Sequence, residues 1–214
     1  MKTSIEPRKA PRQARSQATV DAILDATARI LVERGHATTN TNLVAERAGV
    51  SVGSLYQYFP NKVALIRALH ERHAREMTLA LEREFRPRDG ETLHAALTRV
   101  IGASMHAHQV DADLHRALEQ CEELGLVDDA HDKAHAKMYL LVREMLAAHR
   151  DEVMITNLDL AAFMMIQTVH ALVHATLRER PAGVSVKAAT REIVRLAYAY
   201  LTAREAEDLS LIHI

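Results

Sequence analysis

Histidine is the residue type in this sequence that is most able to do metal chemistry. The chain has 214 residues, of which 13 are histidines. His131 and His135 are four residues apart on one predicted helix, as are His170 and His174 on another, and two histidines at that spacing can share a metal ion. A complete site needs a third ligand and usually an outer shell of hydrogen-bond partners, which the spacing does not supply. We therefore expect solvent, core or interface roles for these histidines, with no metal and no cofactor.

The other candidate for side-chain chemistry is Cys121. It is the single cysteine of the chain, which excludes an internal disulfide and fits a reducing compartment. A lone cysteine on an apolar helix is typical of buried packing rather than of a redox sensor. The sequence also lacks a nucleophile-elbow, phosphate-loop or metalloprotease motif, so we predict that the protein is not an enzyme.

The segment of residues 36–62, HATTNTNLVAERAGVSVGSLYQYFPNK, predicts a different kind of chemistry. Two short helices, at about 41–48 and 52–58, are joined by a turn in the manner of a helix-turn-helix. Gly49 permits the left-handed conformation that this turn needs. The second helix would suit a major groove, with its N-terminal residues at base edges. A small helical subdomain that merely carries polar aromatics would share the pattern, so patterning alone leaves both interpretations open.

A motif within this segment favours DNA binding. The segment strongly resembles the DNA-binding domain of the TetR family of bacterial transcriptional regulators, and the resemblance covers about residues 16–65. It rests on Ala45, Ala48, Gly49, Val50, Ser51, Gly53, Ser54, Leu55, Tyr56, Tyr58, Phe59 and Lys62. One departure is Val63, because many family members have Glu at that position.

The resemblance implies a role for individual residues in contacting DNA. Phosphate contacts, which position a protein on the duplex, would come from Thr41, Ser54, Tyr56, Tyr58 and Lys62. Contacts to bases would come from Asn42, Val52, Gly53 and Gln57. From the pattern of apolar residues, we expect the second helix to present the following residues outward: Val52, Gly53, Ser54, Tyr56, Gln57 and Tyr58.

The elements that position these residues are predicted to be helices only. Apolar residues recur at three- and four-residue spacing, and caps are expected at Asn40, Asn61, Asp111, Asp128, Asn157 and Ser185. The pattern predicts nine helices, at about 16–34, 41–48, 52–58, 62–85, 91–108, 112–121, 128–150, 157–179 and 185–205. The fold class is therefore all-α.

We expect four segments along the chain. Residues 1–15 are a flexible basic arm, 16–62 a three-helix helix-turn-helix domain, and 63–208 a larger helical domain for ligand binding and dimerisation. Residues 209–214 are out of character after a charged helix end and are interpreted as a non-native tail.

The helix at 157–179 is apolar almost all round, so every face of it must be covered. The resemblance implies that this helix and the last helix form an isologous dimer interface. A palindromic DNA site has two half-sites, so its recognition also requires a dimer. The expected interface residues are Met165, Val169, Leu172, Val173, Ile193, Ala197 and Tyr200.

A pocket for a small-molecule effector is implied by the family more than by the residues. Methionines suit a pliable apolar site, although they suit an ordinary core equally well. The candidate lining is Met105, His108, Leu118, Met138, Tyr139, Phe163, Gln167 and His170.

Charge and composition agree with a soluble DNA-binding protein. Residues 1–75 carry twelve Lys and Arg against six Asp and Glu, whereas the remainder carries 15 against 22, so the N-terminal third fits a polyanionic partner. No secretory signal and no membrane-spanning segment are expected, and the predicted location is cytoplasmic. The predicted function is a dimeric repressor that a small molecule releases from a palindromic operator. A ligand-independent DNA-binding protein, an activator, and an enzyme fused to a DNA-binding module are the alternatives.

Overall fold

The computed structural model describes residues 14–126 and 131–204, and these residues form helices joined by turns. Most of the predicted arm, the predicted cap Asp128 and the whole predicted tail lie outside the described residues. Every predicted helix has a counterpart whose ends lie within four residues of the predicted ones, which confirms the all-α prediction. The helices are α1 (Ala14–Thr38), α2 (Thr41–Ala48), α3 (Val52–Tyr58), α4 (Lys62–Phe85), α5 (Leu93–Val110), α6 (Ala112–Glu123), α7 (His131–Ala148), α8 (Leu158–Glu179) and α9 (Val186–Thr202).

Short polar side chains begin several of these helices as predicted. The Oδ1 atoms of Asn40 and Asn61 accept hydrogen bonds from backbone N–H groups three residues on, each at 2.9 Å. Asn157 and Ser185 act in the same way at the starts of α8 and α9. The prediction was wrong for Asp111, whose side chain makes no cap hydrogen bond to the described residues. Its ψ of 52° departs from the extended conformation from which a capping side chain reaches the first amides.

Gly35 interrupts α1 with a φ of 73° and a ψ of 171°, so the regular helix ends where the sequence predicted. Helical turns nevertheless continue to Thr38. The hydroxyl of Thr38 donates to the carbonyl of Arg34 at 2.7 Å, and that of Thr39 donates to the carbonyl of Gly35 at 2.9 Å. These side-chain hydrogen bonds tie the residues after the break back to the carbonyl groups at the break.

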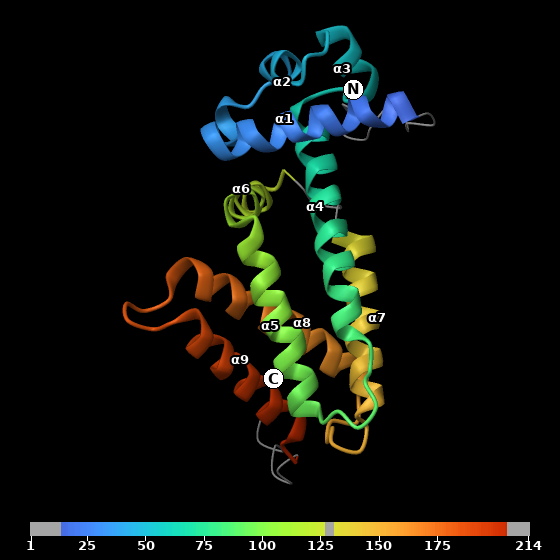
Figure 1. Ribbon diagram of the computed structural model, residues 1–214, viewed down its shortest axis with the longest axis vertical. Coiled ribbons are helices and arrows are strands. Elements are labelled where there is room, and N and C mark those ends of the chain that lie inside the picture. The colour runs from blue at the N-terminus through green and yellow to red at the C-terminus, as the bar shows by residue number, and fades with distance from the viewer. Residues whose placement is uncertain (1–13, 127–130, 205–214) are drawn as a thin grey trace, which may run out of the picture. The chain divides into compact units, whose positions relative to one another are not determined.

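The chain divides into two compact units, and the first contains α1, α2, α3, the part of α4 up to Glu76, and α6. α1 packs against both α2 and α6, and Figure 1 shows α2 and α3 lying along α1. The core of this unit contains Ile23, Leu31, Val44, Leu55 and Leu65, all within 1% of complete burial. It extends beyond the predicted 16–62 domain because it also includes α4 up to Glu76, α6 and the start of α7.

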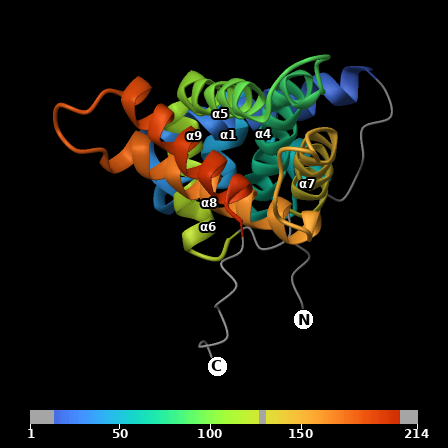
Figure 2. The ribbon, with the colours of Figure 1, turned by 90° about the horizontal axis from the view of Figure 1, so that it is seen from below.

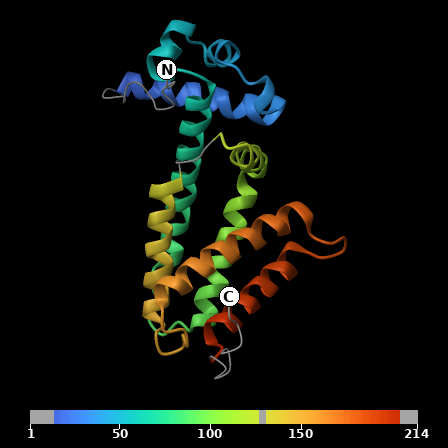
Figure 3. The same cartoon turned by 180° about the vertical axis from the view of Figure 1, so that it is seen from behind.

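The second unit contains the rest of α4 with α5, α7, α8 and α9. α5 packs against both α8 and α9, and α8 and α9 lie side by side (Figures 1 and 3). Their connection extends away from both helices (Figure 2). An ion pair joins α7 to α4, with Lys137 Nζ 2.7 Å from Glu82 Oε2. Arg99 on α5 donates two hydrogen bonds to Glu91, which lies just before that helix.

Among the described helices, only α8 is long and apolar enough to cross a membrane, by length and composition alone. The core helix of a soluble protein passes the same test. Because α8 packs against both α5 and α9, we interpret it as a core helix that also leaves an apolar face at the surface.

Candidate functional site

The predicted helix-turn-helix is present at residues 41–58. Gly49 adopts a left-handed conformation with a φ of 67° and a ψ of 29°, and its N–H donates to the carbonyls of the preceding turn. Ser51 then begins α3, because its Oγ accepts a hydrogen bond from the N–H of Ser54 at 3.0 Å. A bidentate ion pair joins Arg47 on α2 to Glu33 on α1, and this contact lowers the pKa of the Glu33 carboxyl. α2 and α3 are therefore fixed against the rest of the unit.

All four residues that were predicted to contact bases are exposed to solvent. Asn42 at the start of α2 is exposed, and so are Val52, Gly53 and Gln57 on α3. Tyr56 is 39% exposed, and its hydroxyl lies 3.1 Å from Thr41 Oγ1. That hydrogen bond links the start of α2 to the second half of α3, and it holds two of the predicted phosphate-binding hydroxyls together.

The prediction that Tyr58 faces outward was wrong. The side chain is 8% exposed and packs in the core of the first unit. Its hydroxyl is 2.7 Å from Ser16 Oγ on α1. On α3, positions 55 and 58 share the face toward the core, because residues three apart lie on the same side of a helix. Tyr58 therefore ties α3 to α1.

Lys62, another predicted phosphate contact, is half-buried and bonded within the protein. Its Nζ donates to the carbonyl oxygen of His36 at 3.0 Å. That carbonyl lies just beyond the break in α1 at Gly35, so the lysine closes the end of α1 onto the start of α4. The contact holds the ammonium group at one position in this unit.

Gly53 stands in the first turn of α3 without a packing reason to be glycine. A Cβ built there would meet Ser51 Oγ at 3.9 Å as its nearest atom, which is an ordinary contact. The residue also lacks a positive φ, in contrast to Gly49. What the glycine provides is a bare, exposed backbone at the N-terminal turn of the helix, where another backbone could approach closely.

The predicted effector pocket is only partly brought together. Met105 and His108 are buried on α5, and Met138 and Tyr139 are half-buried on α7. Phe163, Gln167 and His170 are exposed on α8. Leu118 is packed in the core of the first unit, whereas the other seven belong to the second. The Tyr139 hydroxyl donates to Asp159 Oδ1 at 2.9 Å.

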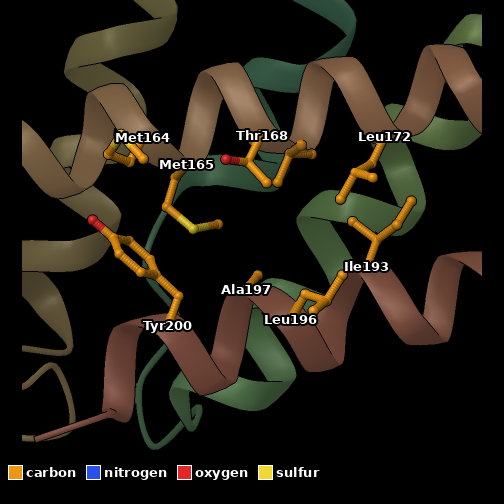
Figure 4. A pocket seen from close by; sticks show the side chains of 9 residues that line it. Met164, Met165, Thr168, Leu172, Ile193, Leu196, Ala197 and Tyr200 are labelled. Atoms are coloured by element: carbon orange, nitrogen blue, oxygen red, sulfur yellow. The ribbon is translucent and has the colours of Figure 1, made fainter.

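The predicted dimer residues on α8 and α9 line an apolar groove between the two helices (Figure 4). Its cavity volume is about 210 Å³. All the predicted interface residues contribute except Val173, which is fully buried in the core of its own unit. The lining is Met164, Met165, Thr168, Val169, Leu172, Ile193, Leu196, Ala197 and Tyr200.

Sequence reasoning missed the two most exposed apolar side chains that line this groove. Leu196 is 56% exposed and Met164 is 40% exposed. Apolar residues occur on all sides of α8, so periodicity could not separate the outward ones from those that face α5. The signal is visible only once the positions of α5 and α9 are known.

The structure describes Cys121 and one of the two histidine pairs that the sequence singled out. Cys121 is completely buried in the core, as predicted, and burial raises the pKa of its thiol. The side chains of His131 and His135 lie outside the described residues. His174 is buried and His170 is exposed on α8, and their ring centroids are 3.9 Å apart.

Comparison with known families matches both parts of the chain. The profile for bacterial regulatory proteins of the tetR family matches residues 23–69, which include α2, α3 and the start of α4. A second profile, the tetracyclin repressor-like C-terminal domain, matches residues 92–201, about half of the chain.

Curated relatives are similar over the N-terminal part. The HTH-type transcriptional repressor KstR of Mycolicibacterium smegmatis is 44% identical over 75 residues, covering 35% of this chain and 31% of that protein. The uncharacterized HTH-type transcriptional regulator YvkB of Bacillus subtilis is 38% identical over 60 residues, covering 28% of this chain and 32% of that protein. The chain thus spans about a third of the length of these relatives.

Solved structures are similar over most of the chain. A protein of unknown function from Rhodococcus sp. RHA1 has a TM-score of 0.70 at 18% identity, covering 86% of this chain and 96% of that one. SmeT, the repressor of the Stenotrophomonas maltophilia multidrug efflux pump SmeDEF, has a TM-score of 0.64 at 21% identity, covering 87% and 93%. These likenesses show a shared fold. Together with the two matching profiles, they show that this chain belongs to the TetR family of bacterial regulatory proteins, a family of DNA-binding regulators rather than of enzymes.

Proposed function

We propose that this protein is a homodimeric, cytoplasmic transcription repressor, bound to a palindromic operator and released from it by a small-molecule effector. The observation that carries the proposal is the helix-turn-helix at residues 41–58. It exposes Asn42, Val52, Gly53 and Gln57 together with the hydroxyl of Tyr56.

The exposed residues suit two kinds of DNA contact. Asn and Gln side chains can hydrogen-bond base edges in the major groove, and a valine can contact a thymine methyl group. Thr41, Ser54 and Tyr56 offer hydroxyl groups to phosphate oxygens, which position a protein without reading sequence. Lys62 would add a positive charge at the start of α4. The excess of basic residues in the N-terminal third would strengthen attraction to any duplex.

A palindromic operator requires two copies of this unit, and the groove on α8 and α9 supports a dimer. Exposed Leu196 and Met164 lie there beside the other apolar side chains that line the groove. Contiguous exposed apolar surface of this kind usually marks an interaction site. A second copy of the same two helices would cover it in a symmetric, isologous arrangement.

The proposal of an effector rests on the second unit and on relatives. One similar structure is a complex of SmeT with triclosan. In this chain, the second unit buries Met105 in its apolar core and packs half-buried Met138 against that core. Flexible methionines adapt to apolar ligands more readily than branched side chains do.

A gel-shift titration tests the central part of the proposal. Purified protein is titrated against the DNA upstream of its own gene and against a shuffled duplex of the same composition. We expect the upstream fragment to bind at least about a thousandfold more tightly, because specific sites exceed non-specific ones by that margin. Equal affinities on several upstream fragments of neighbouring genes would contradict a sequence-specific repressor. A reporter driven by the bound promoter then separates repression from activation.

A further inference from the structure

Three histidines from two helices of the second unit gather at one place. His108 is near the end of α5, while His170 and His174 are one turn apart on α8. The ring centroids of His108 and His174 are 5.0 Å apart, those of His108 and His170 are 6.2 Å apart, and those of His170 and His174 are 3.9 Å apart. The sequence supplied the pair on α8, and packing of α5 against α8 supplies the third ring.

These separations suit coordination of one ion. A zinc ion bound at about 2.0 Å to a ring nitrogen lies roughly 3 Å from the ring centre, so tetrahedral ligands have ring centres about 5 Å apart. The distance between the His108 and His174 rings, 5.0 Å, matches that value, and the other two distances, 6.2 and 3.9 Å, each differ from it by about 1 Å. Ligand nitrogens of His108 and His174 are already within 4.8 Å of each other.

The surroundings of His108 hold its ring in a form that can bind a metal. Its Nδ1 is 2.7 Å from the carbonyl oxygen of Ser104. Because a carbonyl only accepts, Nδ1 carries the proton, and in the neutral ring the lone pair is then on Nε2. A ligating histidine usually donates its other ring N–H to a carbonyl or carboxylate in this way, which fixes both its tautomer and its orientation.

We propose that His108, His170 and His174 bind a divalent transition metal ion of the zinc class. Imidazole ligands favour Zn²⁺, Ni²⁺ or Cu²⁺ over Mg²⁺ and Ca²⁺, which prefer oxygen. His108 and His174 are buried, whereas His170 is exposed and so gives the ion a path from solvent. Three protein ligands leave a fourth tetrahedral position for water or for another molecule. The inference does not depend on operator binding or on release by an effector.

The test measures metal binding directly on the full-length protein without a histidine tag. Protein stripped by a chelator is titrated with Zn²⁺ in a calorimeter, and with Co²⁺ by visible absorption. We expect one Zn²⁺ per chain and the intense Co²⁺ bands of a tetrahedral site. Zn²⁺ should also raise the melting temperature, because a ligand that binds the folded state stabilises it.

Variants locate the site. His108→Gln and His174→Gln should each weaken Zn²⁺ binding at least as much as the loss of an outer-shell partner, about 10- to 100-fold. His170→Ala should do the same, and because His170 is exposed this change tests the proposal even if a buried variant fails to fold. His106→Ala is the matched control, since it removes an exposed histidine two residues away on α5, and it should leave Zn²⁺ affinity unchanged.

The other histidine pair provides the decisive comparison. A His131→Ala/His135→Ala double variant should keep wild-type Zn²⁺ affinity. If that double variant loses binding while His170→Ala keeps it, the site is on α7 and the proposal is wrong. Absence of Zn²⁺ binding by the wild-type protein, or only the weak Co²⁺ bands of octahedral coordination, would overturn it as well.

Discussion

Gly53 lies in the first turn of α3, where neither packing nor backbone conformation within the protein requires a glycine. Gly53→Ala should therefore raise the free energy of unfolding of the first unit by up to about 1 kcal/mol, because alanine is the better helix former. The added methyl group would stand between the helix and the duplex, so operator affinity should fall about tenfold or more. Chemical denaturation and gel-shift titration measure the two effects.

Gly102 provides the control for this prediction. It lies in α5, and a Cβ there would meet nothing within 4 Å, so Gly102→Ala should raise stability without changing operator affinity. Equal operator affinities of the Gly53→Ala variant and the wild type would show that α3 does not approach DNA at this turn.

The two tyrosines of α3 should differ in what their hydroxyl groups do. Tyr58→Phe removes a partly buried hydrogen bond to Ser16, so it should cost about 1 kcal/mol of unfolding free energy and change operator affinity little. Tyr56→Phe removes an exposed hydroxyl, so it should reduce affinity with little loss of stability. Chemical denaturation and DNA titration of both variants measure the two effects. If Tyr58→Phe lowered operator affinity and Tyr56→Phe lowered stability instead, Tyr58 would be the residue that contacts DNA.

At the scale of helices, the apolar face of α8 and α9 is expected to hold two copies together. Leu196→Glu places a charge at a position that is 56% exposed, so the fold should survive while the dimer dissociates. Sedimentation should give the 23.9 kDa of one chain instead of twice that mass. Leu79→Glu on α4, which is also at a 56% exposed position, should remain dimeric. A Leu196→Glu variant that stays dimeric would place the interface elsewhere.

The start of α5 should make the second unit sensitive to acid. Hydrogen bonds from Arg99 lower the pKa of the Glu91 carboxyl, and both side chains are nearly buried. A lowered folded-state pKa gives stability that is complete above the unfolded value, about 4.3, and is lost as pH falls through the folded value. Glu91→Gln should therefore be less stable than wild type at pH 7, with a difference that shrinks below about pH 4. A difference that is constant from pH 7 to 3 would rule out this linkage.

At the scale of the whole molecule, effector and operator should oppose each other. If a compound releases the DNA, it binds the form with low DNA affinity more tightly, typically by about 1–3 kcal/mol. Operator DNA must then weaken binding of the compound by the same factor. Calorimetric titration of a candidate compound, with and without operator, measures both affinities. Equal values would show that the compound is not the effector.

The sequence by itself determined the helices and the motif between residues 41 and 62. Helix ends depend on local chemistry, so Asn40, Gly49 and Asn61 could be interpreted without knowing the fold. The helix-turn-helix was predictable for the same reason, since its turn and both its helices lie within about twenty consecutive residues. The exposure of Gln57 followed from helical periodicity, whereas the place of Asn42 at the surface was implied only by the family resemblance.

Only the tertiary structure decided which core each helix joins and which side chains meet across helices. α6 is amphipathic, and periodicity does not say which apolar surface it covers, so Leu118 was expected in the wrong unit. Tyr58 has a polar tip that suits either solvent or a buried partner, and the partner, Ser16, is 42 residues away. His108 is 66 residues from His174, and their approach requires α5 to pack on α8. Contacts of this kind depend on long-range packing, which local propensity does not encode.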